Sequence, residues 1–521
     1  MRLRVSGRSS DLSRIQIQQV GDAIRLAAPA VEVVPHFRES LGDRMLQDPL
    51  WSMPEKGVFT EDFVEDLRAG RTDLVVHSWK DLPTEVRAGT RVVATLPRAD
   101  VRDVLLVRCD LWPAVAPGST ITILSSSPRR AHNLTPFLAS ALPIQNLRVE
   151  FLPVRGNVPT RLRKLMSGEQ HGLVVAKAAL DRLLTSTAAE FESMRTEVRA
   201  AIGRCRWMIL PVSENPTGAA QGALAMEIPT DGDTDIAAIV NALNDQTTFV
   251  EATREREILR SHGGGCHQKI GVTVLTRPYG TVISVRGLTD AGERLDRFHL
   301  ETERRAPRTT RDKVWPRDAR DGDRAIREPL PAHKPESGAG LWVARADALP
   351  PGWSVDDAIV WTAGLKTWKR LAERGVWVNG SAEGLGERED PRADVLAGRT
   401  IPWVKLTHDR AQAVHGGRQV ATYRVVSVGA PPDLSGYSHF FWTSGSHFLA
   451  AIEHQPEILG GWHACGPGNS WTIIRERLGS DDRLEVWLSQ EEWKKNATRP
   501  RRTAGFLSQD SAAITIPSGA M

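Results

Sequence analysis

The N-terminal part of the chain, to about residue 185, alternates short apolar runs with amphipathic stretches, and this alternation restricts the fold most. Leu74–Val76 is an apolar run, and Glu61–Ala69 before it carries its apolar side chains on one stripe and stops at Gly70. Similar runs occur at Val31–Pro35 and Thr120–Leu124. Strands that alternate with helices form a mainly parallel sheet. The sequence therefore predicts an α/β protein.

A Lys-Asp pair stands where the strand Leu74–Val76 ends. Lys80 and Asp81 follow it closely, and Pro83 prevents regular continuation, so the pair is expected on a turn at the carboxyl edge of the sheet. Ligands of open α/β sheets bind at that edge. We predict that Asp81 is the catalytic acid.

Arginines follow two further predicted strands. Ser127 and Pro128 are typical of an N-cap and first helical position, and Arg129 and Arg130 come directly after them. Arg155 lies in the equivalent loop after the predicted strand Leu147–Val154. Such arginines can be a solvated basic face, but two of these loops on one sheet edge favour a site for several carboxylates or for phosphate.

Nucleic acid is the competing ligand for these arginines, but the interleaved aromatic residues of single-strand binders are missing. A Gly-rich loop ending in Lys-Ser/Thr is also missing, which argues against nucleotide hydrolysis.

Cys266 follows three glycines, Gly263 to Gly265, after a predicted helix Phe249–Arg260. Glycines leave the backbone unhindered, so the thiol can be presented on a loop to another domain. A small residue in a tight turn is the simpler interpretation of one cysteine. His267 would allow a Cys-His nucleophile, but adjacent side chains seldom point the same way.

Composition excludes several classes. The 521 residues carry a net charge of only +4, which does not imply a general nucleic-acid surface. No apolar stretch has the length of a membrane span, and no signal peptide is evident. The four cysteines are widely spaced, which argues against a disulfide scaffold and a zinc site and for the cytoplasm.

The C-terminal part has a different composition. Residues 303–338 are rich in Arg, Asp, Pro and Gly and are expected to be a charged linker. Twelve of the sixteen tryptophans lie after residue 306, and helix and strand signals resume, so we predict a further module at 339–500. The tail 501–521 is expected to be disordered.

Five segments resemble motifs of the hydroxymethylbilane synthase family, also called porphobilinogen deaminase, in the family's order. They are His77–Pro83 (family HSMKDLP), Lys56–Phe59 (KGLF), Ser125–Arg130 (TSSLRR), Val154–Leu162 (LRGNVxTRL) and Gly264–Cys266 (GGC). The chain departs from the family at Glu61, where a second lysine is usual, and it has extra residues, Glu214–Pro216, before Gln221-Gly222.

The resemblance implies two lobes like those of periplasmic binding proteins and a small α+β third domain. Lobe 1 is expected at 1–97 with about 204–228, lobe 2 at 98–203, and the cofactor-carrying domain at 229–302. The α/β module follows the linker.

The resemblance also implies the chemistry. Family members carry a dipyrromethane primer on the loop cysteine, here Cys266, through a thioether. Four porphobilinogen molecules are added to it in turn, each with loss of ammonia through an azafulvene cation, and hydrolysis releases linear hydroxymethylbilane. Asp81 matches the family's catalytic acid.

Arginine forks bind carboxylates bidentately, and every pyrrole ring carries two carboxylates. The positions that match cofactor contacts in the family are Ser78, Lys80, Lys56, Ser125, Ser127, Arg129, Arg130 and Arg155. Arg8, Arg155 and Arg161 match substrate contacts. No metal is implied. The expected partners are porphobilinogen and the growing polypyrrole, without nucleic acid or membrane, in a monomer.

The C-terminal module resembles a shortened uroporphyrinogen-III synthase, at Trp442–Ser446, Cys465–Ser470 and Ala363–Trp368. This implies a bifunctional protein, with a degenerate docking domain as the alternative. For the whole chain, the rival hypothesis is a non-catalytic two-lobed anion-binding or solute-binding protein, which would need no adduct on Cys266.

Overall fold

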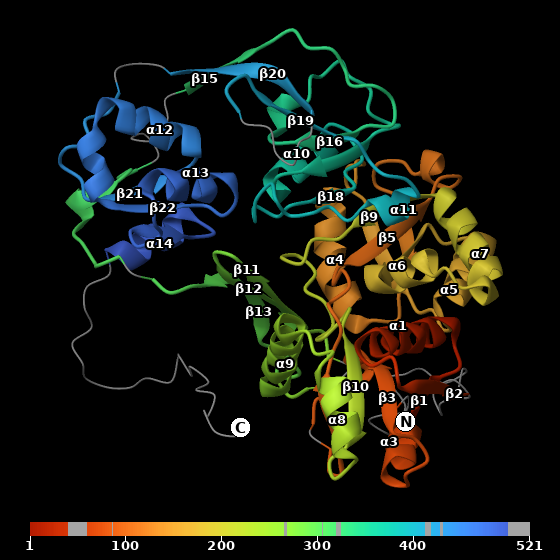
Figure 1. Cartoon of the computed structure of the whole chain (residues 1–521). Coiled ribbons are helices and arrows are strands. Elements are labelled where there is room, and N and C mark those ends of the chain that lie inside the picture. Colours follow the sequence, from red (N-terminus) through yellow and green to blue (C-terminus); the bar gives the residue numbers. More distant parts are fainter. Residues whose placement is uncertain are drawn as a thin grey trace.

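The described chain forms five parts that each combine helices with one sheet, seen in a computed structural model (Figure 1). The structure describes residues 1–39, 60–85, 87–264, 268–304, 306–318, 325–411, 418–427 and 431–498. Lys56, Cys266 and the tail 501–521 lie outside these ranges. Within them, no helix is both long enough and apolar enough to cross a membrane.

Lobe 1 is built on the five-stranded sheet β2-β1-β3-β10-β4. Its elements are β1 (Arg2–Arg8), α1 (Asp11–Ala27), β2 (Glu32–Arg38), α3 (Glu61–Arg68), β3 (Leu74–Ser78), β4 (Thr90–Ala94) and β10 (Leu224–Pro229). β1 pairs in parallel with β2 and β3, whereas β10 runs antiparallel between β3 and β4. The helix α8 (Thr234–Asn241) places Ile236 and Val240 in the same apolar core.

Lobe 2 repeats this plan with the sheet β7-β6-β8-β5-β9. Its elements are β5 (Asp103–Arg108), β6 (Thr120–Leu124), α4 (Pro128–Ala141), β7 (Arg148–Leu152), α5 (Val158–Ser167), β8 (Gly172–Ala176), α6 (Lys177–Thr185), α7 (Glu192–Gly203) and β9 (Cys205–Ile209). The expectation that residues from about 204 belong to lobe 1 is wrong for β9, because β9 pairs with β5. The chain returns to lobe 1 only at β10.

The third domain packs α9 (Gln246–Ser261) against the antiparallel sheet β11 (Gly271–Arg277), β12 (Gly280–Leu288) and β13 (Arg294–Glu301). α9 also contacts lobe 1, where Phe249 lies against Trp79 with ring centroids 5.2 Å apart. The helix that precedes the cysteine loop therefore lies beside the turn that carries Asp81.

The C-terminal part consists of two units, which we call the inner unit and the outer unit. The inner unit has the sheet β15-β20-β19-β16-β17-β18, and the outer unit has the parallel sheet β14-β21-β22-β23. The inner elements are β15 (Ala325–Pro329), β16 (Gly340–Val343), β17 (Ile359–Thr362), α10 (Leu365–Glu373), β18 (Gly380–Ser381), α11 (Asp394–Ala397), β19 (Trp403–His408) and β20 (Arg418–Ser427). The outer elements are β14 (Val314–Trp315), β21 (His439–Trp442), α12 (Gly445–His454), β22 (Trp462–Cys465), α13 (Asn469–Leu478), β23 (Leu484–Val486) and α14 (Gln490–Ala497).

The expected linker 303–338 is not only a linker. β14 pairs with β21 of the outer unit, and β15 pairs with β20 of the inner unit. Both strands are short and stand among charged residues, so the sequence carries no alternating pattern that would reveal them. The chain thus enters the outer unit, crosses to the inner unit and returns.

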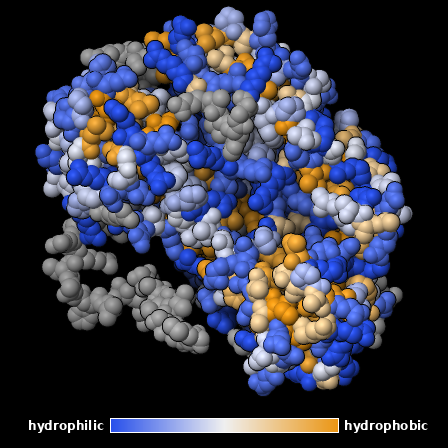
Figure 2. All heavy atoms as spheres, viewed as in Figure 1, coloured by the Kyte–Doolittle hydropathy of each residue, from blue (hydrophilic) through white to orange (hydrophobic). Residues whose placement is uncertain are grey.

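The inner unit lies against lobe 2 (Figure 1). Tryptophans build much of that contact. Trp368 Nε1 donates to Ala141 O at 3.0 Å, and Trp377 Nε1 donates to Trp207 O at 3.0 Å. Core residues of the two parts form shared apolar clusters. This contact accounts for part of the tryptophan excess after residue 306. The face seen in Figure 2 is mainly hydrophilic, with apolar patches in the regions of α8 and α12.

Candidate active site

Asp81 lies on a tight turn at the carboxyl end of β3, as predicted. The turn Trp79–Asp81 is a single 3₁₀ turn closed by Leu82 N, which donates to Trp79 O at 3.2 Å. Trp79 N donates to Ala223 O at 3.1 Å, which fixes the turn against the segment that leads into β10. Asp81 itself is half-buried.

Two helix starts of lobe 2 bring arginines to the same place. Ser127 caps α4 by accepting from Arg130 N, and Asn157 caps α5 by accepting from Thr160 N. Arg129 and Arg130 lie in the first turn of α4 and are buried. Arg161 lies in the first turn of α5, and its Nε donates to Gly156 O at 2.7 Å.

The charges of both lobes act on Arg161. Burial lowers the pKa of the Arg161 guanidinium to about 10, and the like charges of Arg130 and Arg155 add to this shift. The charge of Asp81 opposes this shift, so this carboxylate of lobe 1 lies within electrostatic range of Arg161 of lobe 2. An excess of crowded cations makes this junction a favourable place for ligand carboxylates.

Lys80 belongs to the same junction. Its Nζ donates to Gln221 Oε1 at 3.3 Å. Burial is the main cause that lowers the pKa of the Lys80 ammonium, whereas Asp81 acts in the opposite direction. Lys80 therefore supplies a desolvated cation next to the predicted acid.

Asp103 organises the arginines of α4, a role that the sequence did not suggest. Its carboxylate accepts from Arg129 Nη2 at 2.9 Å and from Arg130 Nε and Nη2 at 3.0 and 2.7 Å. Asn215 Nδ2 and Gln221 Nε2 donate to it as well, each at 2.9 Å. Burial opposes ionisation of Asp103, but the two guanidiniums outweigh it and hold the pKa of the carboxyl far below its usual range.

The acidic and basic residues at 98–103 pair with one another and with the third domain, and their side chains are largely buried. Arg98 pairs with buried Glu255 of α9 at 2.7 Å, and Arg102 pairs with Asp100 at 2.6 Å. The first pair joins the connection between the two lobes to the third domain, and the second is a local pair within that connection. Because Glu255 is distant in sequence, the run of charges alone could not reveal the burial of Arg98.

The other predicted contacts lie at the same edge. Ser78 Oγ accepts from Gln16 Nε2 at 2.9 Å, and Arg8 ends β1, the neighbour of β3. Ser125 is buried at the end of β6, and its Oγ accepts from Ser127 N at 3.3 Å. Lys56 and Cys266 cannot be placed, because both lie outside the described residues.

The described chain approaches Cys266 from α9. A methyl group placed on Gly264 would lie 2.5 Å from Thr84 Oγ1, so the backbone two residues before Cys266 contacts the segment just after Asp81. Gly264 has a φ of 54°, which favours glycine at this close approach.

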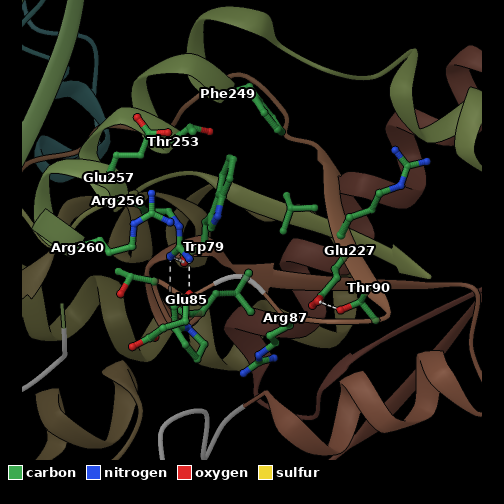
Figure 3. Close-up of a pocket in the computed structure, with 15 residues that line it drawn as sticks. Trp79, Glu85, Arg87, Thr90, Glu227, Phe249, Thr253, Arg256, Glu257 and Arg260 are labelled. Carbon is green, nitrogen blue, oxygen red and sulfur yellow. Dashed lines mark hydrogen bonds between the residues drawn. The ribbon is translucent and has the colours of Figure 1, made fainter. Parts of the chain in front are cut away.

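A pocket of about 310 Å³ lies on the α9 side of the same turn (Figure 3). Trp79, Phe249 and Arg256 are among the residues that line it. Asp81 does not line it, so this pocket adjoins the candidate site and is not the site itself. Arg256 donates to Leu82 O at 2.9 Å, to Trp79 O at 3.3 Å and to Pro83 O. These hydrogen bonds fix the turn from its α9 side.

Sequence reasoning missed Asp103, Asn215, Arg182 and Arg256. Arg182 of α6 donates to Gly222 O at 2.8 Å across the lobes. The sequence signal for this contact between the lobes was the Gln221-Gly222 pair. Gly222 has a φ of 90°, and a Cβ there would lie 2.6 Å from Ala99 O. Only glycine fits, which marks a place where the lobes meet closely.

Fold and site define a two-lobed α/β protein in which one carboxylate of lobe 1 faces a cluster of cations on lobe 2, an arrangement suited to ligands with several carboxylates. The family model described as "Porphobilinogen deaminase, dipyromethane cofactor binding domain" matches residues 3–238. The chain belongs to the porphobilinogen deaminase family.

Curated relatives agree with this assignment. The chain is 32% identical to the porphobilinogen deaminase of Roseiflexus sp. (strain RS-1) over 291 residues, which cover 56% of this chain and 86% of that protein. It is 31% identical to the enzyme of Burkholderia orbicola (strain MC0-3) over 293 residues, 56% of this chain and 80% of that protein. It is also 31% identical to the enzyme of Bordetella parapertussis over 325 residues, 61% of this chain and 92% of that protein.

The family resemblance seen in the motifs is thus confirmed, as is dipyrromethane as the cofactor. The chain functions as a porphobilinogen deaminase, a transferase of tetrapyrrole biosynthesis. The residues present fit the cofactor. Arg129 and Arg130 each use three of the five guanidinium donors on described protein acceptors, and the remaining donors suit carboxylates.

Proposed function

We propose that Asp81 is the catalytic acid of a stepwise condensation of four porphobilinogen molecules into linear hydroxymethylbilane. The observation that carries this proposal is the position of Asp81 on the turn that ends β3 of lobe 1, where its charge acts on Arg161 of lobe 2, as do the charges of Arg130 and Arg155. A site with this charge pattern can hold the acetate and propionate groups of pyrroles while it stabilises one cationic centre.

Asp81 acts on the aminomethyl group of the substrate. As ammonia leaves, positive charge spreads over the methylene carbon and the pyrrole nitrogen, and an adjacent carboxylate lowers the free energy of that charge. At a separation of 4 Å and an effective dielectric constant of 20, the interaction is worth about 4 kcal/mol, or roughly 10³-fold in rate. The bond to nitrogen breaks, a carbon–carbon bond forms, and the attacked ring carbon releases its proton.

The cationic residues bind and orient. Arg8, Arg155 and Arg161 are the proposed substrate contacts. Lys56, Ser78, Lys80, Ser125, Ser127, Arg129, Arg130 and Arg155 are the proposed cofactor contacts. Dipyrromethane, when bound through a thioether to Cys266, supplies the pyrrole ring on which the chain is extended. The contact of Gly264 with Thr84 supports Cys266 as the attachment point, because Gly264 stands two residues before Cys266 in the sequence and lies against the segment just after Asp81.

Intact-mass measurement of the purified protein tests the enzyme against a solute-binding protein of the same fold. We expect a mass above that of the polypeptide by one dipyrromethane, and a bare polypeptide with Cys266→Ala. A bare mass for the unaltered protein would refute the enzymatic assignment.

Asp81→Asn tests the catalytic residue. We expect a loss of roughly 10³-fold in kcat, from the Coulomb energy above, with the dipyrromethane adduct retained. Asp110→Asn is the control, because Asp110 is an exposed aspartate paired with Arg108 away from the site. Near-normal turnover of Asp81→Asn would refute its role.

We also propose that the C-terminal units form a second active site, which closes the linear product to uroporphyrinogen III. A specific observation supports it. His408, at the end of β19 in the inner unit, and His447, on α12 of the outer unit, lie close enough for the charge of one to lower the pKa of the other. Burial is the larger cause of the lowered pKa of His408, and Lys405 adds to it.

Basic side chains from both units therefore lie near their junction, where Gly386 and Gly468 also approach closely. Imidazole and ammonium groups of this kind can donate hydrogen bonds to the carboxylates of a linear tetrapyrrole. The purified protein given porphobilinogen should yield the type III isomer. Formation of type I alone, by spontaneous closure, would show that the second activity is absent.

We further propose a cytoplasmic monomer without nucleic-acid or membrane partners.

A further inference from the structure

The segment 210–217 joins β9 of lobe 2 to the approach of β10 in lobe 1, and it is bonded to several parts of the protein. It contains Glu214–Pro216, the residues by which this chain exceeds the family pattern. Ser284 Oγ of the third domain donates to Val212 O at 2.8 Å. The segment therefore lies where lobe 2, the third domain and the site meet.

Asn215 connects this segment to the arginines of the site. It is 1% exposed. Its Oδ1 accepts from Arg129 Nη1 at 2.9 Å, and its Nδ2 donates to Asp103 Oδ2 at 2.9 Å. Pro216 O accepts from the same Arg129 nitrogen at 2.7 Å. Three of the five donors of Arg129 are thus directed by Asp103 and by the inserted residues, which fixes the plane of the guanidinium.

Glu383 of the inner unit holds the other end of the segment. Its carboxylate accepts from Val212 N at 2.9 Å, from Ser213 N at 2.7 Å and from Ser213 Oγ at 2.6 Å. Glu383 has a φ of 55°, a left-handed conformation that residues other than glycine seldom adopt. Such conformations persist where the surroundings require them, and here the requirement is the carboxylate's position.

A second contact supports the same attachment. Ile209 N, at the end of β9, donates to Asn379 O at 2.7 Å, and Asn379 Nδ2 donates to Trp207 O at 2.9 Å. The inner unit is therefore bonded to the backbone of β9 and to the two residues that lead toward Asn215.

We propose that Asn215 is a positioning residue of the deaminase site, and that the inner C-terminal unit sets its position through Glu383. Glu383 fixes Val212 and Ser213, these residues fix Asn215, and Asn215 orients Arg129 toward the carboxylates of the bound pyrroles. The inner unit is then part of the deaminase, whatever the C-terminal units do themselves. This inference rests on the proposed function, in which Arg129 contacts the cofactor.

The test compares Asn215→Ala with Asn133→Ala. Asn133 is also 1% exposed and lies on α4 one turn after Arg129, but its Nδ2 donates to Arg286 O, and none of its described hydrogen bonds is to Arg129 or Asp103. For Asn215→Ala we expect kcat to fall roughly tenfold, the scale of one hydrogen bond to a charged group, with KM within twofold and the dipyrromethane adduct retained. Asn133→Ala should keep kcat near that of the unaltered protein at a similar melting temperature. Equal kcat values for the two variants would overturn the proposal.

Glu383→Gln tests whether the inner unit acts on the site through Asn215. It should lower kcat in the same direction, and the double variant with Asn215→Ala should be no slower than Asn215→Ala alone, because both changes act through Arg129. Multiplicative losses would overturn the coupling. Ser213→Ala removes one of the three bonds to Glu383 and should give a smaller loss of kcat, which provides the same test should Glu383→Gln not fold. An unaltered protein without adduct or turnover would instead refute the proposed function itself.

Discussion

Replacing Asp103 by asparagine should destabilise the protein more than any surface change. Asp103 is fully buried and accepts five hydrogen bonds, three of them from Arg129 and Arg130. Asparagine has nearly the volume of aspartate but no charge. Its NH₂ group replaces one carboxylate oxygen and cannot accept the hydrogen bonds which that oxygen accepts from Arg129, Arg130 and their neighbours. Breaking one side of a buried ion pair costs about 3–5 kcal/mol, because the remaining cations stay buried without compensation.

If the two lobes unfold together, as a unit of about 230 residues, that loss corresponds to a fall of roughly 6–20 °C in melting temperature. The assay is thermal unfolding followed by circular dichroism at pH 7, with Asp110→Asn as the exposed control, which should melt close to the unaltered protein. Unchanged melting of Asp103→Asn would show that Arg129 and Arg130 do not depend on this carboxylate, and would refute the reasoning.

The pH dependence of the melting temperature gives a second measure of the interaction between Asp103 and the two arginines. The folded protein lowers the pKa of Asp103, so the pair contributes stability at pH values above the pKa of an unfolded aspartate, about 3.9, and loses it as the pH falls below that value. The difference in melting temperature between the unaltered protein and Asp103→Asn should therefore be constant from pH 5 to 8 and narrow only below about pH 4. A difference that widened at low pH would contradict this sign.

Three further changes have defined outcomes. Gly222→Ala should lower the melting temperature, because a Cβ would lie 2.6 Å from Ala99 O at a φ of 90°, and unchanged melting would contradict that geometry. Arg256→Ala should lower kcat by about 10-fold or more with KM little changed, since its guanidinium holds three carbonyl oxygens of the catalytic turn, and a change in KM alone would refute that role. A chain ended after Arg304 should aggregate in size-exclusion chromatography because it exposes the apolar face around Trp207, whereas a stable monomer would show that lobe 2 does not need the inner unit.

The sequence predicted those parts of the fold that depend on neighbouring residues. β6 has the predicted bounds, and Ser127 caps α4 with Pro128 at its first position. The turn at Asp81 follows from an apolar run that meets Pro83. In each place the cause of the structure lies within a few residues of its effect.

The errors came from partners that are distant in the chain. Arg98 is buried because Glu255, 157 residues away, neutralises it, and Asp103 is buried because α4 supplies two guanidiniums. β9 could not be assigned to lobe 2 from its own residues, since its pairing with β5 decides the matter. The motif match identified candidate contacts, but Asn215 lies in an insertion, where a family pattern has nothing to match.

The nested order of the strands has a consequence for how the chain is made. Lobe 1 lacks β10, the strand between β3 and β4, until the whole of lobe 2 has been synthesised. At about 5–20 residues per second, the roughly 130 residues between Ala94 and Leu224 take about 7–26 s to emerge from the ribosome. β14 waits in the same way for β21 while the inner unit is completed. Assembly therefore proceeds from the inserted parts outward, and the unpaired edges of β3 and β4 are open to aggregation during that interval.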